Sequence, residues 1–238
     1  NAYDEGISLI ITVDNGIQGH HEISTIQELG VDVIVTDHHE IGETLPDAFA
    51  IVHPMHPNFE YPFKYLCGAG VAYKLAQGLI EHPPQHFIAL AAIGTIADLV
   101  SLTDENRYIV KQGLKILNNH TPSSIKAILN QAGFNDEITE ETIGFIIGPR
   151  LNAVGRLEDA SLAAELLLSD EFEEAEFLAE QVEHFNHERK DIVSKITDEA
   201  LLLAEEQIKQ GHLFLLLAKE GWHEGVLGIV ASKIVETY

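Results

Sequence analysis

The sequence predicts an α/β protein whose parallel sheet is flanked by helices. Two short apolar runs, Leu9–Val13 and Val31–Thr36, have the length and the β-branched content of buried strands. Residues 18–29 between them show the spacing of an amphipathic helix, and Gly30 suits the end of that helix. A strand–helix–strand unit of this kind places its two strands parallel in one sheet.

Polar clusters follow both predicted strands at the point where each strand ends. Asp14-Asn15-Gly16 follows the first strand, and Asp37-His38-His39 follows the second. The carboxyl ends of parallel strands lie at one edge of a sheet, where open α/β sheets bind their ligands, so we expect the two clusters to meet. Carboxylate and imidazole ligands together suit a divalent transition metal.

Each cluster taken alone also has a structural interpretation. Asp-Asn-Gly between apolar runs is a common hairpin turn, although the residues after Gly16 do not alternate as a returning strand would. The two adjacent histidines could belong to a solvated loop. The occurrence of both clusters at neighbouring strand ends favours a binding site.

Broken and helical segments alternate in the next part of the chain. Prolines make residues 40–65 a loop, with one further strand over 48–53. His53 and His56 in this loop could bind a metal, but the surrounding prolines are more typical of a plain loop. Helices are predicted over residues 71–80, 87–99 and 106–118.

Asp98 stands near the end of the most apolar predicted helix. Apolar residues surround that helix on all sides, which predicts that it is buried. A buried carboxylate without a partner is costly, so Asp98 should be paired, bound to a metal or used to cap the following turn.

The second half of the chain is predicted to be largely helical. Helices begin at Thr121 and Thr139, and further helices cover residues 160–168 and 172–207. The last is long and contains no Gly or Pro, which indicates a connector between lobes; a coiled-coil partner is the alternative. Residues 213–218 have the pattern of a buried strand, and residues 221–232 lead into a helix.

Two of the few arginines, Arg150 and Arg156, lie in a Gly- and Pro-containing segment that is predicted to be a loop. The planar fork of a guanidinium can bind phosphate through two hydrogen bonds. The alternative for either arginine is a salt bridge to one of the many acidic residues.

The overall charge argues against a non-specific nucleic-acid binder. Only 14 Lys and Arg oppose 38 Asp and Glu, a formal net charge of −24. Local clusters of basic residues and bound metal ions could offset this acidity.

The single cysteine, Cys67, excludes an internal disulfide framework and fits a reducing cytoplasm. Neither a membrane span nor a signal peptide is recognisable, so no membrane partner is expected.

The strand-end clusters resemble motifs of the DHH phosphoesterase superfamily, which is named after the triplet at Asp37-His38-His39. Gly94–Asp98 resembles a later motif of the same superfamily, and three further segments resemble motifs of its RecJ-type exonucleases: Ile147–Leu157, Asn186–Lys190 and Gly221–Ser232. The resemblance covers essentially the whole chain. It implies a DHH domain over residues 1–170, a connecting helix over 171–210 and the start of a second α/β domain, DHHA1, over 211–238.

The resemblance also implies a reaction and the residues that perform it. RecJ-type enzymes digest single-stranded DNA from the 5′ to the 3′ end in DNA repair and recombination, using two Mn²⁺ or Mg²⁺ ions. Asp14 would bridge both ions, and His38 and Asp98 would bind one of them. Asp37 would orient a histidine and His39 would contact the phosphate. The nucleic-acid path would be lined by His39, Arg150, Asn152 and Arg156.

One family motif has no counterpart in the chain. DHH enzymes carry an earlier strand that ends in Asp-x-Asp, and nothing before Leu9 matches it. We therefore expect an internal fragment that is inactive by itself and binds at most one metal weakly. Two alternatives to the exonuclease are a DHH hydrolase of short oligonucleotides or cyclic dinucleotides, and a non-catalytic scaffold that binds replication or repair proteins.

Overall fold

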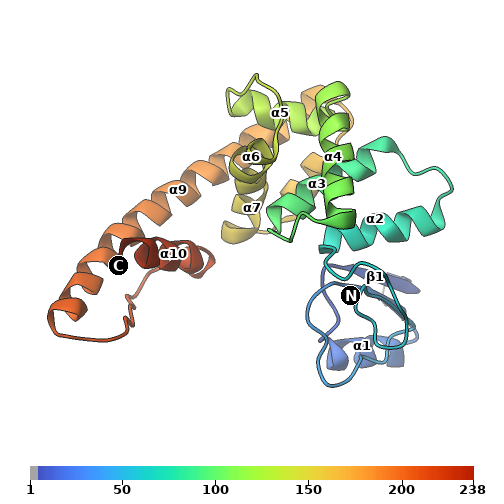
Figure 1. Cartoon of the computed structure of the whole chain (residues 1–238), viewed down its shortest axis with the longest axis horizontal. Coiled ribbons are helices and arrows are strands. Elements are labelled where there is room, and N and C mark those ends of the chain that lie inside the picture. Colours follow the sequence, from blue (N-terminus) through green and yellow to red (C-terminus); the bar gives the residue numbers. More distant parts are fainter. Residues whose placement is uncertain (1–4) are drawn as a thin grey trace. The chain divides into compact units, whose positions relative to one another are not determined.

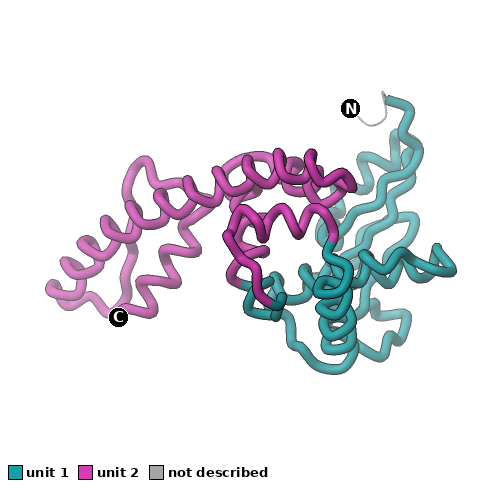
Figure 2. Tube along the Cα trace, turned by 90° about the horizontal axis from the view of Figure 1, so that it is seen from above, with its two compact units in different colours: residues 1–121, 137–144 teal, residues 122–136, 145–238 magenta. Residues whose placement is uncertain are grey.

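The computed structural model describes residues 5–238, which divide into two compact units. The first unit contains the chain up to Thr121 together with Glu137–Gly144, and the second contains Pro122–Asp136 and Phe145–Tyr238 (Figure 2). Residues 1–4, part of the segment searched for an Asp-x-Asp motif, lie outside the described residues. In the described part, no helix is both long enough and apolar enough to cross a bilayer.

The first unit contains the predicted parallel sheet. Its strands are β1 (Leu9–Val13), β2 (Asp32–Thr36) and β3 (Ala50–Val52), in the order β1-β2-β3 (Figure 1). Helix α1 (His20–Glu28) connects β1 to β2, so the strand–helix–strand prediction is confirmed. Ile23 of α1 packs with Val33 and Val35 of β2 in a buried cluster that fixes the helix on the sheet.

Helices α2 (Gly68–Leu79), α3 (Gln85–Ala97) and α4 (Asp104–Asn119) complete most of the first unit, close to the predicted helical ranges. Helix α3 is buried, as expected, because it packs against both of the others. Two glycines permit this close packing. A Cβ on Gly94 would lie 2.4 Å from the Cβ of Ala69, and a Cβ on Gly113 would lie 2.3 Å from the Cβ of Ala92.

The second unit is helical among its described residues. Its helices are α5 (Ser123–Gln131), α7 (Gly148–Leu157), α8 (Ser161–Leu168), α9 (Phe172–Lys209), the 3₁₀ helix η2 (Glu224–Val226) and α10 (Leu227–Thr237). Helix α9 confirms the predicted long helix. It packs against α5, α7 and α8, and against α10 through a separate apolar cluster that includes Val193, Ile196, Val226 and Val230.

The prediction of a loop over Ile147–Leu157 was wrong. The chain is helical from Glu140 to Leu157, through α6 (Glu140–Thr142), the π-helix η1 (Ile143–Ile147) and α7. Pro149 lies in the first turn of α7, directly after the π-helix η1, and its fixed φ suits the first turn of an α-helix. The proline therefore stands where the π-helix changes to the α-helix and does not end the helical run.

The prediction of a buried strand over residues 213–218 was also wrong. No strand is assigned there, and Leu213 and Phe214 are exposed. The apolar residues of this segment are explained differently. Leu215 and Leu217 pack on the apolar cluster between α9 and α10, while the side chains next to them face solvent. The backbone N–H and C=O of Leu216 pair with the side chain of Gln207, which replaces the partner that a strand would need.

Gly113→Ala should lower the free energy of unfolding by about 1–3 kcal/mol, because the new methyl group collides with Ala92 and with the backbone oxygen of Ile88. Gly78→Ala in α2 is the matched control, since no atom lies within 4 Å of its Cβ position. That variant should be neutral or stabilising by up to ~1 kcal/mol. Urea unfolding of the two variants side by side measures both values. Equal stabilities would contradict the packing of α3 on α4.

Candidate metal centre

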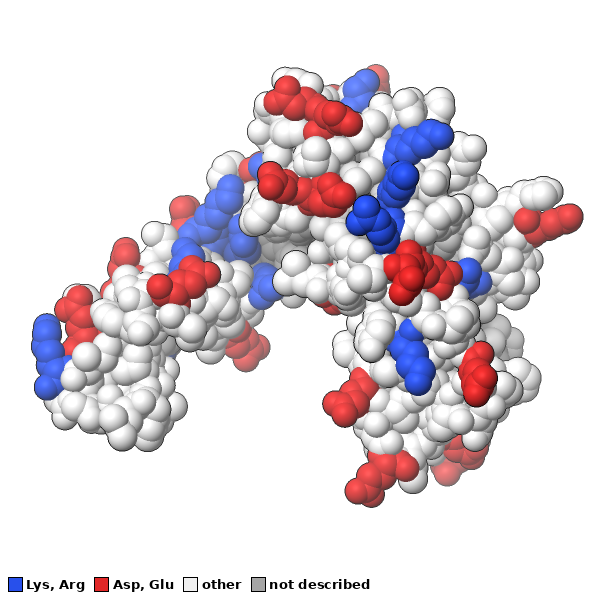
Figure 3. Space-filling view, viewed as in Figure 1, with Lys and Arg blue, Asp and Glu red and all other residues white. Residues whose placement is uncertain are grey.

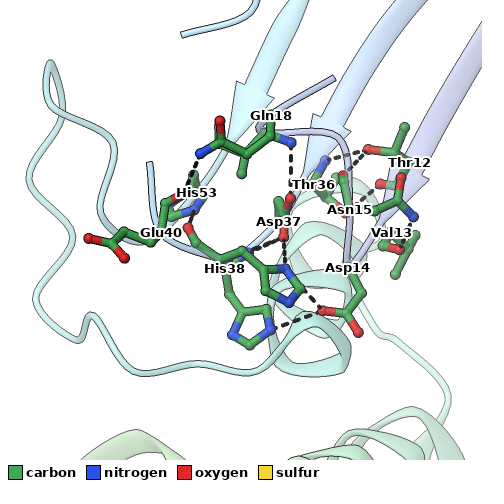
Figure 4. Close-up of polar contacts among 12 residues, drawn as sticks. Thr12, Val13, Asp14, Asn15, Gln18, Thr36, Asp37, His38, Glu40 and His53 are labelled. Atoms are coloured by element: carbon green, nitrogen blue, oxygen red, sulfur yellow. Dashed lines mark hydrogen bonds and ion pairs between the residues drawn. The ribbon is translucent and has the colours of Figure 1, made fainter. Parts of the chain in front are cut away.

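The carboxyl ends of β1 and β2 place the two predicted clusters together. Val13 pairs with Thr36 at the last position of the register, so Asp14 and Asp37 leave the sheet side by side (Figure 4). The backbone N–H of Asp14 donates to the oxygen of Thr36 at 3.0 Å, which extends the ladder by one bond.

Asp37 is the structural anchor of this edge. Its side chain is buried, and Oδ1 accepts hydrogen bonds from the backbone N–H groups of His38 and His39 and from Nδ1 of His39, the last at 2.7 Å. Oδ2 accepts from the N–H of Ile17 at 3.0 Å. Burial by itself would raise the pKa of Asp37, but the hydrogen bonds from Ile17, His39 and His38 lower it overall. Asp37 is therefore a charged acceptor that fixes both histidines.

His38 lies between two carboxylates. Its Nε2 is 3.0 Å from Oδ1 of Asp14 and 3.6 Å from Oδ2 of Asp98. This nitrogen is buried, yet among the described residues it makes no aligned hydrogen bond. Ligand-type atoms of Asp14, His38 and His39 all lie within 4.8 Å of one another. A buried nitrogen without a hydrogen bond, next to carboxylate oxygens, has the donor set and spacing that a divalent cation needs.

Asp98 reaches the site from the C-terminal end of α3, where it is the residue that caps the helix. Its carboxylate is half-exposed, not fully buried as the sequence suggested. Partial burial raises its pKa; the charge of Asp14 raises it further, and His38 lowers it. Two carboxylates that face the same histidine would be stabilised by a cation.

The backbone around Asp14 is adapted to the site. Asp14 has a φ of 64°, a left-handed conformation that Asp tolerates better than most residues. Its side chain lies against the first residue of α2, since a Cβ on Gly68 would be 2.3 Å from its Oδ1. The N-terminal end of a helix favours negative charge. Glycine at position 68 therefore leaves the space that the Asp14 carboxylate occupies.

His53 is a residue whose role the sequence reasoning missed. It follows β3, the third parallel strand, and its side chain is buried. Its Nδ1 accepts from the N–H of Met55, and its Nε2 lies 2.8 Å from the backbone oxygen of His39, to which it donates. The position directly after a third strand was the signal that could have identified it. His53 thus holds the backbone of His39 in place and is not one of the candidate metal ligands.

Three of the predicted nucleic-acid residues, Arg150, Asn152 and Arg156, belong to the second unit, whereas His39 belongs to the first. On α7, Arg150 pairs with Glu183, as the salt-bridge alternative proposed, and its Nη1 donates to the oxygen of Ile146 at 2.9 Å. Arg156 donates from Nη1 to the oxygen of Gly225 at 2.9 Å. Asn152 is exposed. Their role in nucleic-acid binding stays a prediction.

Asp37→Asn should lower the free energy of unfolding by about 2–3 kcal/mol, because the new amide N–H₂ would face the N–H of either Ile17 or His39. Asp32→Asn, on the exposed face of β2, should change stability by less than ~0.5 kcal/mol. Chemical denaturation measures both. A loss for Asp37→Asn no larger than for the control would contradict the anchoring role.

Comparisons with known proteins agree with this architecture. The profile of the DHH family, N-terminal domain, matches residues 2–99. The chain is 50% identical over 236 residues to the single-stranded-DNA-specific exonuclease RecJ of Bacillus subtilis, covering 99% of this chain and 30% of that protein. It is 38% identical over 257 residues to RecJ of Escherichia coli, covering 100% of this chain and 44% of that protein. The chain thus spans less than half the length of these relatives.

A solved structure extends the agreement to three dimensions. The crystal structure of RecJ in complex with Mn²⁺ from Thermus thermophilus matches with a TM-score of 0.84 and 33% identity, over 99% of this chain and 36% of that chain. A structure of exonuclease RecJ bound to manganese matches with a TM-score of 0.83 and 33% identity, over 99% of this chain and 61% of that chain. On these grounds the chain belongs to the DHH family and, within it, to the RecJ type.

Proposed function

We propose that this chain is the metal-binding part of a 5′ to 3′ exonuclease that hydrolyses phosphodiester bonds in single-stranded DNA. The observation that carries the proposal is the buried Nε2 of His38, which makes no aligned hydrogen bond within residues 5–238 and lies beside the carboxylates of Asp14 and Asp98. The 50% identity to a relative named as a single-stranded-DNA-specific exonuclease supports this substrate over short oligonucleotides, cyclic dinucleotides or a scaffold role.

Asp14, His38 and Asp98 would hold Mn²⁺ or Mg²⁺, the ions bound in the similar RecJ structures. Two ions are proposed for the intact protein, and Asp14 would be among the residues that hold them. When bound, such ions supply Lewis-acid stabilisation of the phosphate and a water of lowered pKa.

The remaining residues of the edge would bind and orient the substrate. Asp37 keeps the proton of His39 on Nδ1, and this hydrogen bond raises the pKa of His39. The His39 ring is largely exposed, so its Nε2 would donate a hydrogen bond to a phosphate oxygen. Asp37 thus has a positioning role, as the sequence-based hypothesis assumed.

The nucleic-acid path, the partners and the domain limits complete the proposal. Arg150, Asn152 and Arg156 would line the path of single-stranded DNA, and repair or replication proteins would be further partners in the cytoplasm. Residues 1–170 would form the DHH domain, 171–210 the connecting helix and 211–238 the start of the DHHA1 domain. The sequence motifs of the RecJ type support these assignments.

Gly68→Ala should weaken Mn²⁺ binding by the chain about tenfold or more, because the added methyl group would occupy the space of the Asp14 carboxylate. Gly78→Ala, ten residues along the same helix, has open space around its Cβ position and should bind as the wild type does. Isothermal titration with MnCl₂ measures both affinities. Unchanged binding in Gly68→Ala would remove Asp14 from the set of ligands.

Asp98→Asn in the intact protein should slow Mn²⁺-dependent digestion of 5′-labelled single-stranded DNA roughly 100-fold or more, because a charged ligand is lost. Asp32→Asn leaves the site intact and should retain full activity. Release of labelled nucleotide over time is the measurement. Digestion by Asp98→Asn at the wild-type rate would exclude the proposed role of Asp98.

A further inference from the structure

A polar network joins α7 and α9 in the second unit. Glu183 is buried on α9, and Oε2 of its carboxylate lies 2.5 Å from Nε of Arg150, while Oε1 accepts from Nη2 of Arg150 at 3.3 Å. Asn186, fully buried one turn further along α9, donates from Nδ2 to the same carboxylate at 3.3 and 3.4 Å. Its Oδ1 accepts from Nη2 of Arg189 at 2.9 Å. The spacing of 183, 186 and 189 places all three on one helical face.

The charges of this network do not balance. Glu183 pairs with Arg150 and lies 3.5 Å from His187, whereas Arg189 is linked to this carboxylate only through Asn186. In the part of the chain that the structure describes, no acidic group pairs with Arg189. The chain has 38 acidic residues and only 14 basic ones, so a missing counter-charge here is unexpected.

Arg189 has a further unsatisfied group. Its Nε is buried and has no hydrogen-bond partner among the described residues. Burial of the guanidinium and the positive charges of Arg156 and Arg150 lower its pKa, and Glu183 raises it. A half-buried guanidinium beside other cations is costly without an anion, and a buried donor without a partner indicates an absent acceptor.

We propose that Arg189 and Arg150, held in place by Asn186 and Glu183, form a cradle for a phosphate group of a nucleic-acid backbone. The inference rests on the proposed function and adds Arg189 to it as a phosphate-binding residue. The guanidinium fork of Arg189 matches the paired oxygens of a phosphodiester, and Arg150, whose nitrogens contact Glu183 and Ile146, adds its positive charge. Figure 3 shows Lys and Arg side chains gathered over the middle of α9, on a chain that is otherwise rich in acids.

Glu183 and Asn186 act as positioning residues in this arrangement. Glu183 takes up the charge of Arg150 through two contacts and so fixes its plane. Asn186 links Glu183 to Arg189, because its amide nitrogen donates to Glu183 and its amide oxygen accepts from Arg189. The adjacent Lys190 is exposed and makes no ion pair among the described residues, so it offers a matched cation outside the cradle.

The test is the binding of a fluorescent single-stranded oligonucleotide by the chain, followed by anisotropy in EDTA at several salt concentrations. Arg189→Gln should weaken binding roughly tenfold and reduce the slope of log K against log salt by about one. Lys190→Gln removes the same charge from the next residue and should change affinity by less than about twofold. Equal effects of the two variants, or no salt-dependent binding by the wild type, would overturn the cradle.

Two controls separate binding from folding. Arg189→Lys keeps the charge but loses the fork, so it should keep the salt slope and bind about three- to fivefold more weakly. Inorganic phosphate should raise the melting temperature of the wild type above that in chloride of equal ionic strength, and should not do so for Arg189→Gln. A lower melting temperature in Arg189→Gln with unchanged affinity and salt slope would show a purely structural role and reject the proposal.

EDTA separates this inference from the proposed hydrolysis. If single-stranded DNA binds in a way that depends on Arg189, but the intact protein does not digest it with Mn²⁺, the cradle is supported and the exonuclease is rejected. Digestion with Mn²⁺, with wild-type affinity in Arg189→Gln, would support the exonuclease and reject the cradle.

Discussion

The hydrogen bonds to the buried carboxylate of Asp37 are the interaction on which the candidate site depends. One acidic group receives three backbone N–H groups and one imidazole N–H, and so joins the end of β2 to the turn before α1. A charged acceptor with four donors withstands burial that an unpaired carboxylate would not. His38 and His39 consequently leave the strand in fixed directions, one toward Asp14 and Asp98 and the other toward solvent.

Close packing supplies the remaining part of the site. Asp98 lies at the end of α3, and the position of α3 depends on glycines that allow α2 and α4 to approach it. Gly68 leaves space for the Asp14 carboxylate at the start of α2. Small residues thus determine where two ligand-type carboxylates lie, although they carry no chemistry themselves.

The local arrangement of charge, and not the net charge, supports the proposal that this acidic chain binds a polyanion. Around His38 the negative charges of Asp14 and Asp98 face each other, which suits a cation that would in turn attract phosphate. On α7 and α9 the imbalance has the opposite sign, since Glu183 pairs with Arg150 and no acidic group pairs with Arg189 among the described residues. The net charge of −24 is therefore a poor guide to the local potential at either place.

The sequence by itself determined the strand–helix–strand unit, the long helix and the approach of Asp14 to His38, because apolar periodicity and the parallel connection are local properties. Only the tertiary structure decided that residues 147–157 are helical, that residues 213–218 form no strand, and that His53 supports the triplet. These outcomes depend on a proline at a permissive position in a helix, on the lack of a pairing strand and on contacts between residues far apart in the chain. The same holds for Arg189, whose missing counter-charge becomes visible only when α7 lies against α9.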